Sequence, residues 1–371
     1  MLTPKDVHAM LAAADGDAGL FVPRAALATL VRTEGSSFRR AGSQMLVGAN
    51  GRIVRGFSGG CPESDIALRA TRVIASGIGE RARYNRENGL DLLIEMGCGG
   101  ELEIVLEPMA ERASLRFLDV IAERWRSRET AIMASGFPAD PSRTAAGRLI
   151  WCDGKILLDG LGNDTAAAVI AAADSGHSMT SRTLVLAGAA TDVLYQPILP
   201  PIQLVLIGAN AVADTLARAA RDLAWPVVRI DPRTTTADEF ARRSAIGGSG
   251  EPPVCDGNTF VVCMTYQLER DLDYAAAALA TAVPYVGILG SHRRAAQMQQ
   301  RLDERCGGAA RGRLFTPAGL SIGSEDVEEI AVSLVAEIMA VAARKSGLPL
   351  SRSSEPIHAN NVTGIHADSR P

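Results

Sequence analysis

Two cysteines lie inside glycine clusters, and this setting is the strongest chemical signal in the chain. The clusters are Gly59-Gly60-Cys61 and Cys98-Gly99-Gly100. Glycine lets the backbone approach a ligand closely, and a thiolate is a soft nucleophile and a soft metal ligand. The two clusters therefore predict a site that holds a soft metal or passes sulfur. A disulfide framework is the weaker interpretation.

The sequence after the first cluster predicts a helix over residues 62–76, with Cys61 at its N-cap. The proline at 62 suits the first helical position, and Glu63 and Asp65 complement the positive end of the helix dipole. That dipole and the free backbone N–H groups would stabilise a Cys61 thiolate, which could then contact a metal. A small buried or capping residue is the alternative for Cys61, and a tight turn is the alternative for Cys98.

The composition is that of an ordinary soluble protein and argues against several classes of function. The 371 residues are 47% hydrophobic and 22% charged, and the net charge of −4 gives no reason to expect nucleic acid as a partner. Residues 1–19 do not resemble a signal peptide, and no apolar run is long enough to cross a bilayer. Six cysteines without CxxC spacing fit a reducing compartment, so we expect a cytoplasmic location. Five scattered histidines make a histidine-based zinc site an unattractive interpretation.

The N-terminal part, residues 1–199, is predicted to be an α+β domain, and its pattern suggests a degenerate tandem repeat. A strand at 25–33, a hairpin around Asn50-Gly51 and the helix at 62–76 recur further along. The second set is a strand at 131–134, strands at 148–151 and 155–158 around Asp153-Gly154, and a helix at 165–173. Chance resemblance of two such units is the open alternative.

Two stretches align the copies of this repeat. Residues 40–47 match residues 143–150 in pattern, and the stretch 105–108 is echoed at 194–197. The second copy has Gly162-Asn163-Asp164-Thr165 near the place of Gly59-Gly60-Cys61-Pro62, and nothing in it corresponds to the cluster around Cys98. The cysteines are thus additions to one copy of a scaffold, which places the function in the first copy.

The C-terminal part, residues 200–346, is predicted to be α/β, a Rossmann-like doubly wound parallel sheet, with a flexible tail at 347–371. An apolar strand, a turn at Gly208, a helix, a second strand and Asp231 follow one another, as in dinucleotide sites. Ser291 lies just past the carboxyl end of another predicted strand, where open α/β sheets bind ligands. Asn210 replaces the second glycine of the usual turn, which weakens the prediction of a nucleotide. Cys263 lies inside an apolar strand and is predicted to be core.

These motifs together resemble the XdhC/CoxI family of molybdenum-cofactor maturation proteins. The resemblance rests on motifs that follow the family's order over most of residues 25–343. They are Thr33-Glu34-Gly35-Ser36-Ser37, Arg39-Arg40-Ala41-Gly42, Gly59-Gly60-Cys61, Cys98-Gly99-Gly100 with Glu103 and Glu107-Pro108, the Rossmann turn, Tyr285–Ser291 and Pro317–Gly323. Each motif is modest alone, and the combination is specific.

The resemblance implies an accessory protein that is not itself an enzyme. Its cargo would be the molybdenum cofactor, as molybdopterin or its cytosine dinucleotide form, protected while a terminal oxygen is exchanged for sulfur. The implied partners are an apo-molybdenum hydroxylase of the xanthine, aldehyde or carbon monoxide dehydrogenase type and a cysteine desulfurase as sulfur donor. We also expect a homo-oligomer such as a dimer. The C-terminal domain could serve self-association or docking to the hydroxylase, and the sequence does not separate the two.

The resemblance assigns cofactor contacts to matching residues. Cys61 would contact molybdenum, and Gly59, Gly60 and the pair Arg39-Arg40 would hold the pterin phosphate. A turn that needs a positive φ is the alternative for the glycines, and a solvated basic pair is the alternative for the arginines. The complete set of predicted contacts is Cys61, Cys98, Gly59, Gly60, Gly99, Gly100, Arg40, Gly208, Asp231 and Ser291. The family usually has a second glycine and a histidine in the Rossmann turn, where this chain has Asn210-Ala211. This altered turn motivates one alternative, a silent regulator without cofactor. The Rossmann order and Asp231 motivate another, an NAD(P)-dependent oxidoreductase.

Overall fold

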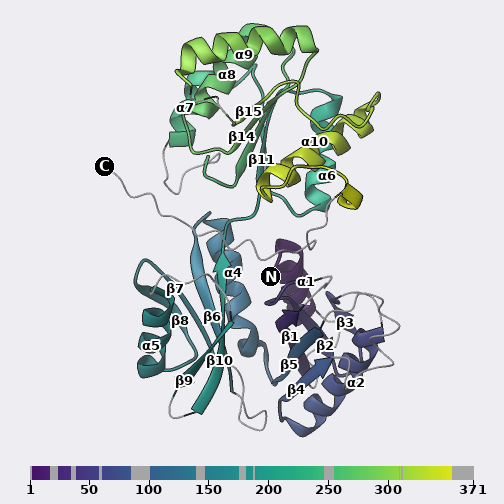
Figure 1. Ribbon diagram of the computed structural model, residues 1–371, viewed down its shortest axis with the longest axis vertical. Coiled ribbons are helices and arrows are strands. Elements are labelled where there is room, and N and C mark those ends of the chain that lie inside the picture. The colour runs from purple at the N-terminus through teal and green to yellow at the C-terminus, as the bar shows by residue number, and fades with distance from the viewer. Residues whose placement is uncertain are drawn as a thin grey trace. The chain divides into compact units, whose positions relative to one another are not determined.

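The computed structural model divides the chain into two compact units, built on Met1–Leu199 (unit 1) and Pro200–Ser353 (unit 2) (Figure 1). The structure describes residues 2–16, 24–34, 39–57, 61–84, 101–138, 147–174, 181–186, 189–245, 255–308, 310 and 312–352.

Unit 1 consists of two halves with the same topology. The first half contains α1 (Pro4–Asp15), β1 (Ala25–Glu34), β2 (Gln44–Gly48), β3 (Ile53–Val54), α2 (Cys61–Ser76), β4 (Glu80–Tyr84) and β5 (Glu101–Met109). The second half contains η1 (Arg112–Leu115), α4 (Arg116–Arg126), β6 (Ala131–Pro138), β7 (Arg148–Cys152), β8 (Lys155–Asp159), α5 (Asn163–Asp174), β9 (Ser181–Leu186) and β10 (Ala189–Ile198). The strand orders are β3-β2-β1-β5-β4 and β8-β7-β6-β10-β9, as the predicted tandem repeat requires.

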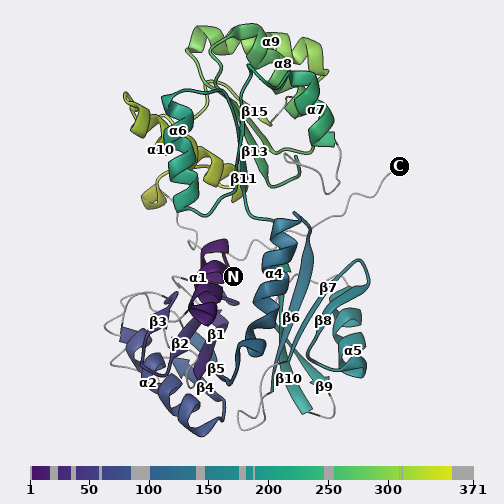
Figure 2. The ribbon, with the colours of Figure 1, turned by 180° about the vertical axis from the view of Figure 1, so that it is seen from behind.

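Each sheet of unit 1 is covered by a helix of its own and shares a core with the other. The helix α2 packs on one face of the first sheet, and α5 packs on the corresponding face of the second (Figures 1 and 2). The opposite faces of both sheets contribute to one apolar cluster with α1 and α4. Alternating side chains along each strand therefore face two cores, which explains why β1 and β2 are buried on both sides.

The strand register corrects the alignment of the two copies. Leu27 on β1 lies opposite Leu46 and Glu107, and Met133 on β6 lies opposite Ile150 and Gln196. If Glu107 corresponds to Gln196, as the sequence echo indicates, then Leu46 corresponds to Ile150. The alignment of residues 40–47 with 143–150 paired Leu46 with Leu149 and was wrong by one residue. A one-residue slip would turn every side chain to the other face of the sheet, and sequence similarity this weak does not detect it.

Buried ion pairs join the two halves of unit 1. Arg148 on β7 places its guanidinium 2.5 Å from the carboxylate of Glu107 on β5, and both side chains are almost fully buried. The same guanidinium lies 4.5 Å from the ring centroid of Phe117 on α4. Arg81 on β4 bridges Glu103 and Asp192, at 2.7 Å to each, and so links β5 to β10 of the other half. The acids of the motif Glu103–Glu107 thus hold the halves together.

Unit 2 is a parallel five-stranded sheet with helices on both faces, which confirms the predicted Rossmann-like fold. The strand order is β12-β11-β13-β14-β15, and every neighbouring pair is parallel. Its elements are β11 (Gln203–Ile207), α6 (Ala211–Asp222), β12 (Val227–Ile230), α7 (Ala237–Ala245), β13 (Thr259–Cys263), α8 (Leu268–Leu279), β14 (Tyr285–Ile288), α9 (His292–Cys306), β15 (Leu314–Phe315), α10 (Val327–Ala342) and η2 (Leu350–Arg352).

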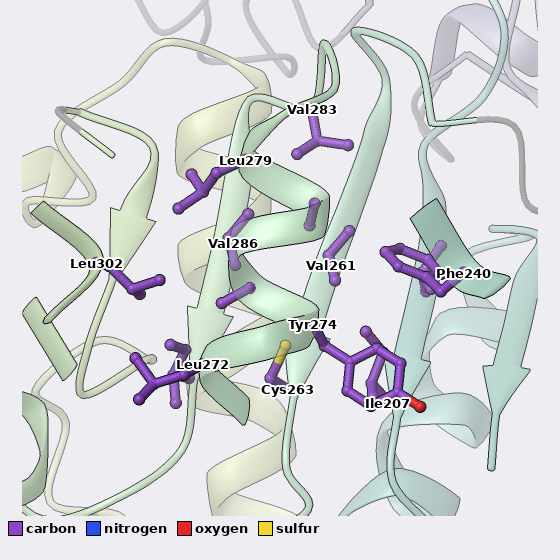
Figure 3. Close-up of a cluster of buried hydrophobic side chains, with 14 of the residues drawn as sticks. Ile207, Phe240, Val261, Cys263, Leu272, Tyr274, Leu279, Val283, Val286 and Leu302 are labelled. Carbon is purple, nitrogen blue, oxygen red and sulfur yellow. The ribbon is translucent and has the colours of Figure 1, made fainter. Parts of the chain in front are cut away.

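Two apolar layers hold this sheet. The helices α7, α8 and α9 cover one face, whereas α6 and α10 cover the other (Figures 1 and 2). Cys263 lies on the first of these faces among Val261, Leu272 and Val286 and is fully buried, which confirms it as a core residue (Figure 3). Because β11, β13 and β14 are buried on both faces, they read in the sequence as continuous apolar runs.

Candidate functional site

Cys61 is the first residue of α2, a helix that is firmly packed on the sheet of the first half. Ile66, Ala70 and Val73 form a buried stripe of α2 against strands β1, β2 and β5. The helix begins at Cys61, one residue earlier than predicted, so Cys61 lies in the first turn and is not the cap. Backbone N–H groups of a first turn have no partner within the helix. Together with the helix dipole they would stabilise a thiolate at this position.

The other predicted contacts around the two cysteines lie outside the described part of the chain. These are Gly59, Gly60, Cys98, Gly99 and Gly100, and the side chain of Cys61 also lies outside it. The described residues on either side of these loops show where each loop begins and ends. They are Phe57 and Cys61 for the first loop, and Tyr84 and Glu101 for the second.

The described residues on either side of the segment that carries Cys98 are tied to α2 and to each other. Tyr84, the last residue of β4, lies opposite Leu102 of β5. The Tyr84 hydroxyl donates a 2.6 Å hydrogen bond to Asp65, in the second turn of α2. One side of the segment is thus anchored to the helix that begins with Cys61.

A buried carboxylate lies near this helix start and binds two arginines. Asp6 of α1 is 1% exposed, and its carboxylate accepts hydrogen bonds from the backbone and side chain of Thr3 at 2.9 and 2.8 Å. Arg55 donates to it through Nε at 2.6 Å, and Nη1 of Arg39 lies 3.5 Å away. Burial alone would raise the pKa of Asp6, but the bonds from Arg55 and Thr3 and the charge of Arg39 lower it below its usual 3.8.

This arrangement predicts a contribution of Asp6 to stability that depends on pH. Because the pKa is lower in the folded state, the contribution is present above about pH 4 and is lost as pH falls through the folded pKa. Urea unfolding of Asp6→Asn should therefore show a shallower loss of stability in acid than the wild type. Asp15→Asn, at the exposed end of the same helix, is the control. Parallel stability curves for Asp6→Asn and wild type between pH 7 and about 3 would contradict the assignment.

The structure separates the roles of the adjacent arginines in the predicted phosphate-binding pair. Arg40 is exposed, and its carbonyl accepts a hydrogen bond from Ser43 in the turn before β2. Arg39, its neighbour, is the residue that faces Asp6. The Gly42 carbonyl of this turn accepts a 3.1 Å hydrogen bond from Gln196 of the other half. The motif Arg39–Gly42 therefore has a structural function in addition to any contact of Arg40 with a ligand.

Arg55 and Gly56 are not among the predicted contacts, yet they connect Asp6 to the start of α2. A Cβ atom on Gly56 would lie 2.6–2.8 Å from the carboxylate of Glu63 in the first turn of this helix, so a larger residue would displace that side chain. Arg55 has a φ of 63°, which is rare for a residue with a side chain. The one available signal was their position, six and five residues before Cys61.

In unit 2, the polar groups of the turn at Gly208–Asn210 bind neighbouring residues of the chain. Gly208 has a φ of 133°, and a Cβ atom there would lie 2.8 Å from the Met264 carbonyl oxygen. Asn210 caps α6 by accepting a hydrogen bond from the Ala213 N–H at 3.1 Å, and its amide donates to the same Met264 oxygen at 2.8 Å. Gly208 and Asn210 thus serve the close contact between β11 and the end of β13.

Loss of the Asn210 side chain should destabilise unit 2. We expect Asn210→Ala to lower the free energy of unfolding by about 1–2 kcal/mol, because the helix cap and the bond to Met264 are both lost. Asn210→Asp, which keeps the capping oxygen and loses the donor, should fall between Ala and wild type. Urea unfolding followed through Trp225 measures the change. An unfolding midpoint of Asn210→Ala equal to that of wild type would show that neither bond matters.

The two other predicted contacts of unit 2 also have partners within the chain. The Arg233 side chain and backbone N–H bind the Asp231 carboxylate and lower its pKa to about 2. The Ser291 hydroxyl caps α9 by accepting a 3.4 Å hydrogen bond from the Arg294 N–H. These contacts lend no support to the oxidoreductase alternative, which needs Asp231 for a ribose.

Three of the described cysteines outside the glycine clusters are poorly suited to reaction. Burial raises the pKa of the Cys152, Cys263 and Cys306 thiols. A thiol with a raised pKa is a weak nucleophile at neutral pH. Within the ranges that the structure describes, no three His, Cys, Asp or Glu side chains are grouped so that they could hold a metal ion. The described helices include none with the length and apolar character needed to span a bilayer.

Comparisons with known proteins agree with this architecture. Residues 204–338 match the model of the XdhC Rossmann domain, and residues 23–85 match that of the XdhC and CoxI family. The second match includes Cys61 and ends before Cys98.

Several relatives match most of the chain. A probable xanthine dehydrogenase subunit of Bacillus subtilis is 27% identical over 85% of this chain and 92% of its own length. The "molybdenum cofactor insertion chaperone PaoD" of Escherichia coli is 23% identical over 85% and 83%. A crystal structure described as a xanthine dehydrogenase from Bacillus halodurans has the same fold, with a TM-score of 0.70 over 94% of this chain and 99% of that one, at 22% identity. With both units matched by models of the same family, the chain belongs to the XdhC and CoxI family.

Proposed function

We propose that this chain binds the molybdenum cofactor, protects it while a terminal oxygen is exchanged for sulfur, and inserts it into a molybdenum hydroxylase. The chain is an accessory protein, in line with the name of its relative PaoD. The client would be an apo-hydroxylase of the xanthine, aldehyde or carbon monoxide dehydrogenase type, with a cysteine desulfurase as sulfur donor. A homo-oligomer acting in the cytoplasm would carry molybdopterin or its cytosine dinucleotide form.

One difference between the two halves of unit 1 carries this proposal. In the first half, α2 begins with Cys61, and in the second half α5 begins with Asn163 at the same place in the topology. A helix start offers free N–H groups and the positive end of a dipole, which favour a thiolate that can bind a soft metal. Because the fold forms in the second half without a cysteine there, Cys61 is not needed for the scaffold.

Transfer of cargo to a client tests the function directly. Protein purified from cells that make molybdopterin would be mixed with an apo-molybdenum hydroxylase, and the hydroxylase activity gained would be measured over time. The proposal expects activation that scales with the cofactor carried and that is faster than with free cofactor at equal concentration. Activation no faster than with free cofactor would contradict a role in insertion.

A further inference from the structure

Arg55 is held so that one edge of its guanidinium is fixed and another is available. Its Nε donates to the Asp6 carboxylate at 2.6 Å, and its side chain is 33% exposed. Within the described part of the chain, its two Nη groups make no hydrogen bond or ion pair. A guanidinium has five N–H donors in a rigid fork, and a pair of parallel N–H groups fits a carboxylate or phosphate oxyanion.

The contact with Asp6 orients the donors of Arg55. Thr3 fixes the fully buried Asp6 carboxylate through two hydrogen bonds at the start of α1, and Asp6 in turn holds Arg55 and Arg39. A second carboxylate, that of Glu63, lies against Gly56. The attraction for an anion therefore comes from the Nη donors of Arg55 and not from a net positive charge of the cluster.

The position of Arg55 relates this edge to Cys61. Gly56, the next residue, lies against the carboxylate of Glu63, which belongs to the first turn of α2, the helix that Cys61 begins. A cargo that carries a phosphate would find the arginine fork on the segment that leads into the helix beginning with Cys61. Resting on the proposed function, we propose that Arg55 binds the phosphate of the pterin cargo through its Nη groups, with Asp6 as the residue that positions it.

A pair of pterins that differ by one phosphate tests this assignment. The probes are the oxidised, fluorescent pterin with its phosphate and the same pterin after phosphatase treatment, titrated into the full chain. Arg55→Gln should weaken binding of the phosphorylated pterin roughly 10- to 100-fold, the usual effect of losing hydrogen bonds to a charged group. Binding of the dephosphorylated pterin should stay the same.

Arg52→Gln is the matched control, because Arg52 is an exposed arginine three residues away in the hairpin before β3. It should bind both pterins as the wild type does. Arg55→Lys keeps a charge beside Asp6 and serves if Arg55→Gln does not fold. It should also lose affinity for the phosphorylated pterin, because an ammonium cannot form the paired bonds. Equal loss for both pterins in the Arg55 variants, or no loss, would overturn the assignment to phosphate.

Failure of the proposed function would be visible separately. Wild-type protein that binds neither pterin would contradict the cofactor proposal itself. Calorimetry with inorganic pyrophosphate would then decide the anion assignment alone. Binding that is lost in Arg55→Gln and kept in Arg52→Gln would support it, and absence of binding to the wild type would overturn it.

Discussion

Glu107→Gln is expected to lower the free energy of unfolding of unit 1 by about 3–5 kcal/mol. Arg148 and Glu107 have side chains only 6% and 2% exposed, so the substitution leaves a buried guanidinium without its counter-charge. Removing one partner of a buried pair is costly, because the remaining charge keeps its desolvation penalty and loses the compensating attraction. The ring of Phe117 beside Arg148 does not replace a carboxylate.

The measurement is urea unfolding in a Trp225→Phe background, in which the fluorescence comes from Trp125 and Trp151 of unit 1. Glu34→Gln breaks an exposed pair with Arg32 and should change stability by less than about 1 kcal/mol. The double variant Glu107→Met, Arg148→Met should recover most of the loss, since an apolar pair has no charge to desolvate. A loss below about 1 kcal/mol for Glu107→Gln would show that the pair does not hold the two halves together.

The pair of Arg148 and Glu107 has no charged counterpart at the equivalent positions of the repeat. With the register corrected, Arg148 corresponds to Gln44, and Glu107 corresponds to Gln196. Both glutamines are buried, and the side-chain amide of Gln44 makes no hydrogen bond to the described residues. Each half thus contributes one member of the charged pair, Glu107 or Arg148, and one of the two neutral amides, Gln44 or Gln196. A buried polar joint of this kind favours one orientation of the halves over others.

Local signals in the sequence were sufficient to predict most of the fold. The turn at Asn50-Gly51 and its flanking strands predicted the β2–β3 hairpin, and the apolar runs predicted β11, β13 and β14. The order of strands and helices around Gly208 predicted the parallel sheet. The helices α1 and α4 were not predicted, although Phe117, Leu118 and Ile121 of α4 have the spacing of a buried helical stripe.

The site could be predicted only in part, because its described contacts join residues far apart in the sequence. Cys61 and Arg40 stand out through local motifs. Asp6 and Arg55 are 49 positions apart, and no local pattern reveals that they meet. The φ of 63° at Arg55, the residue directly after β3, is likewise not indicated by any local pattern. Chemistry that resides in one short motif is visible in a sequence, whereas the residues that orient it become visible with the fold.

Cofactor content tests the central claim most directly, and the expected effect of Cys61→Ser on it is large. Wild-type protein would be purified from cells that make molybdopterin, and its molybdenum and oxidised-pterin fluorescence would be compared with those of Cys61→Ser. A serine hydroxyl is a poor soft-metal ligand, so pterin retention should fall more than about tenfold, equivalent to about 1.4 kcal/mol of binding free energy. Cys98→Ser should also lower it.

Cys306→Ser is the control for this measurement, because it replaces a partly buried thiol in unit 2 by the same residue. The account predicts that wild type and Cys306→Ser carry pterin and molybdenum in amounts close to that of the chain, and that Cys61→Ser loses both. Equal cofactor content in wild type and Cys61→Ser would contradict the assignment of Cys61. Wild-type protein without pterin, from cells that supply it, would contradict the proposal that this chain carries the cofactor.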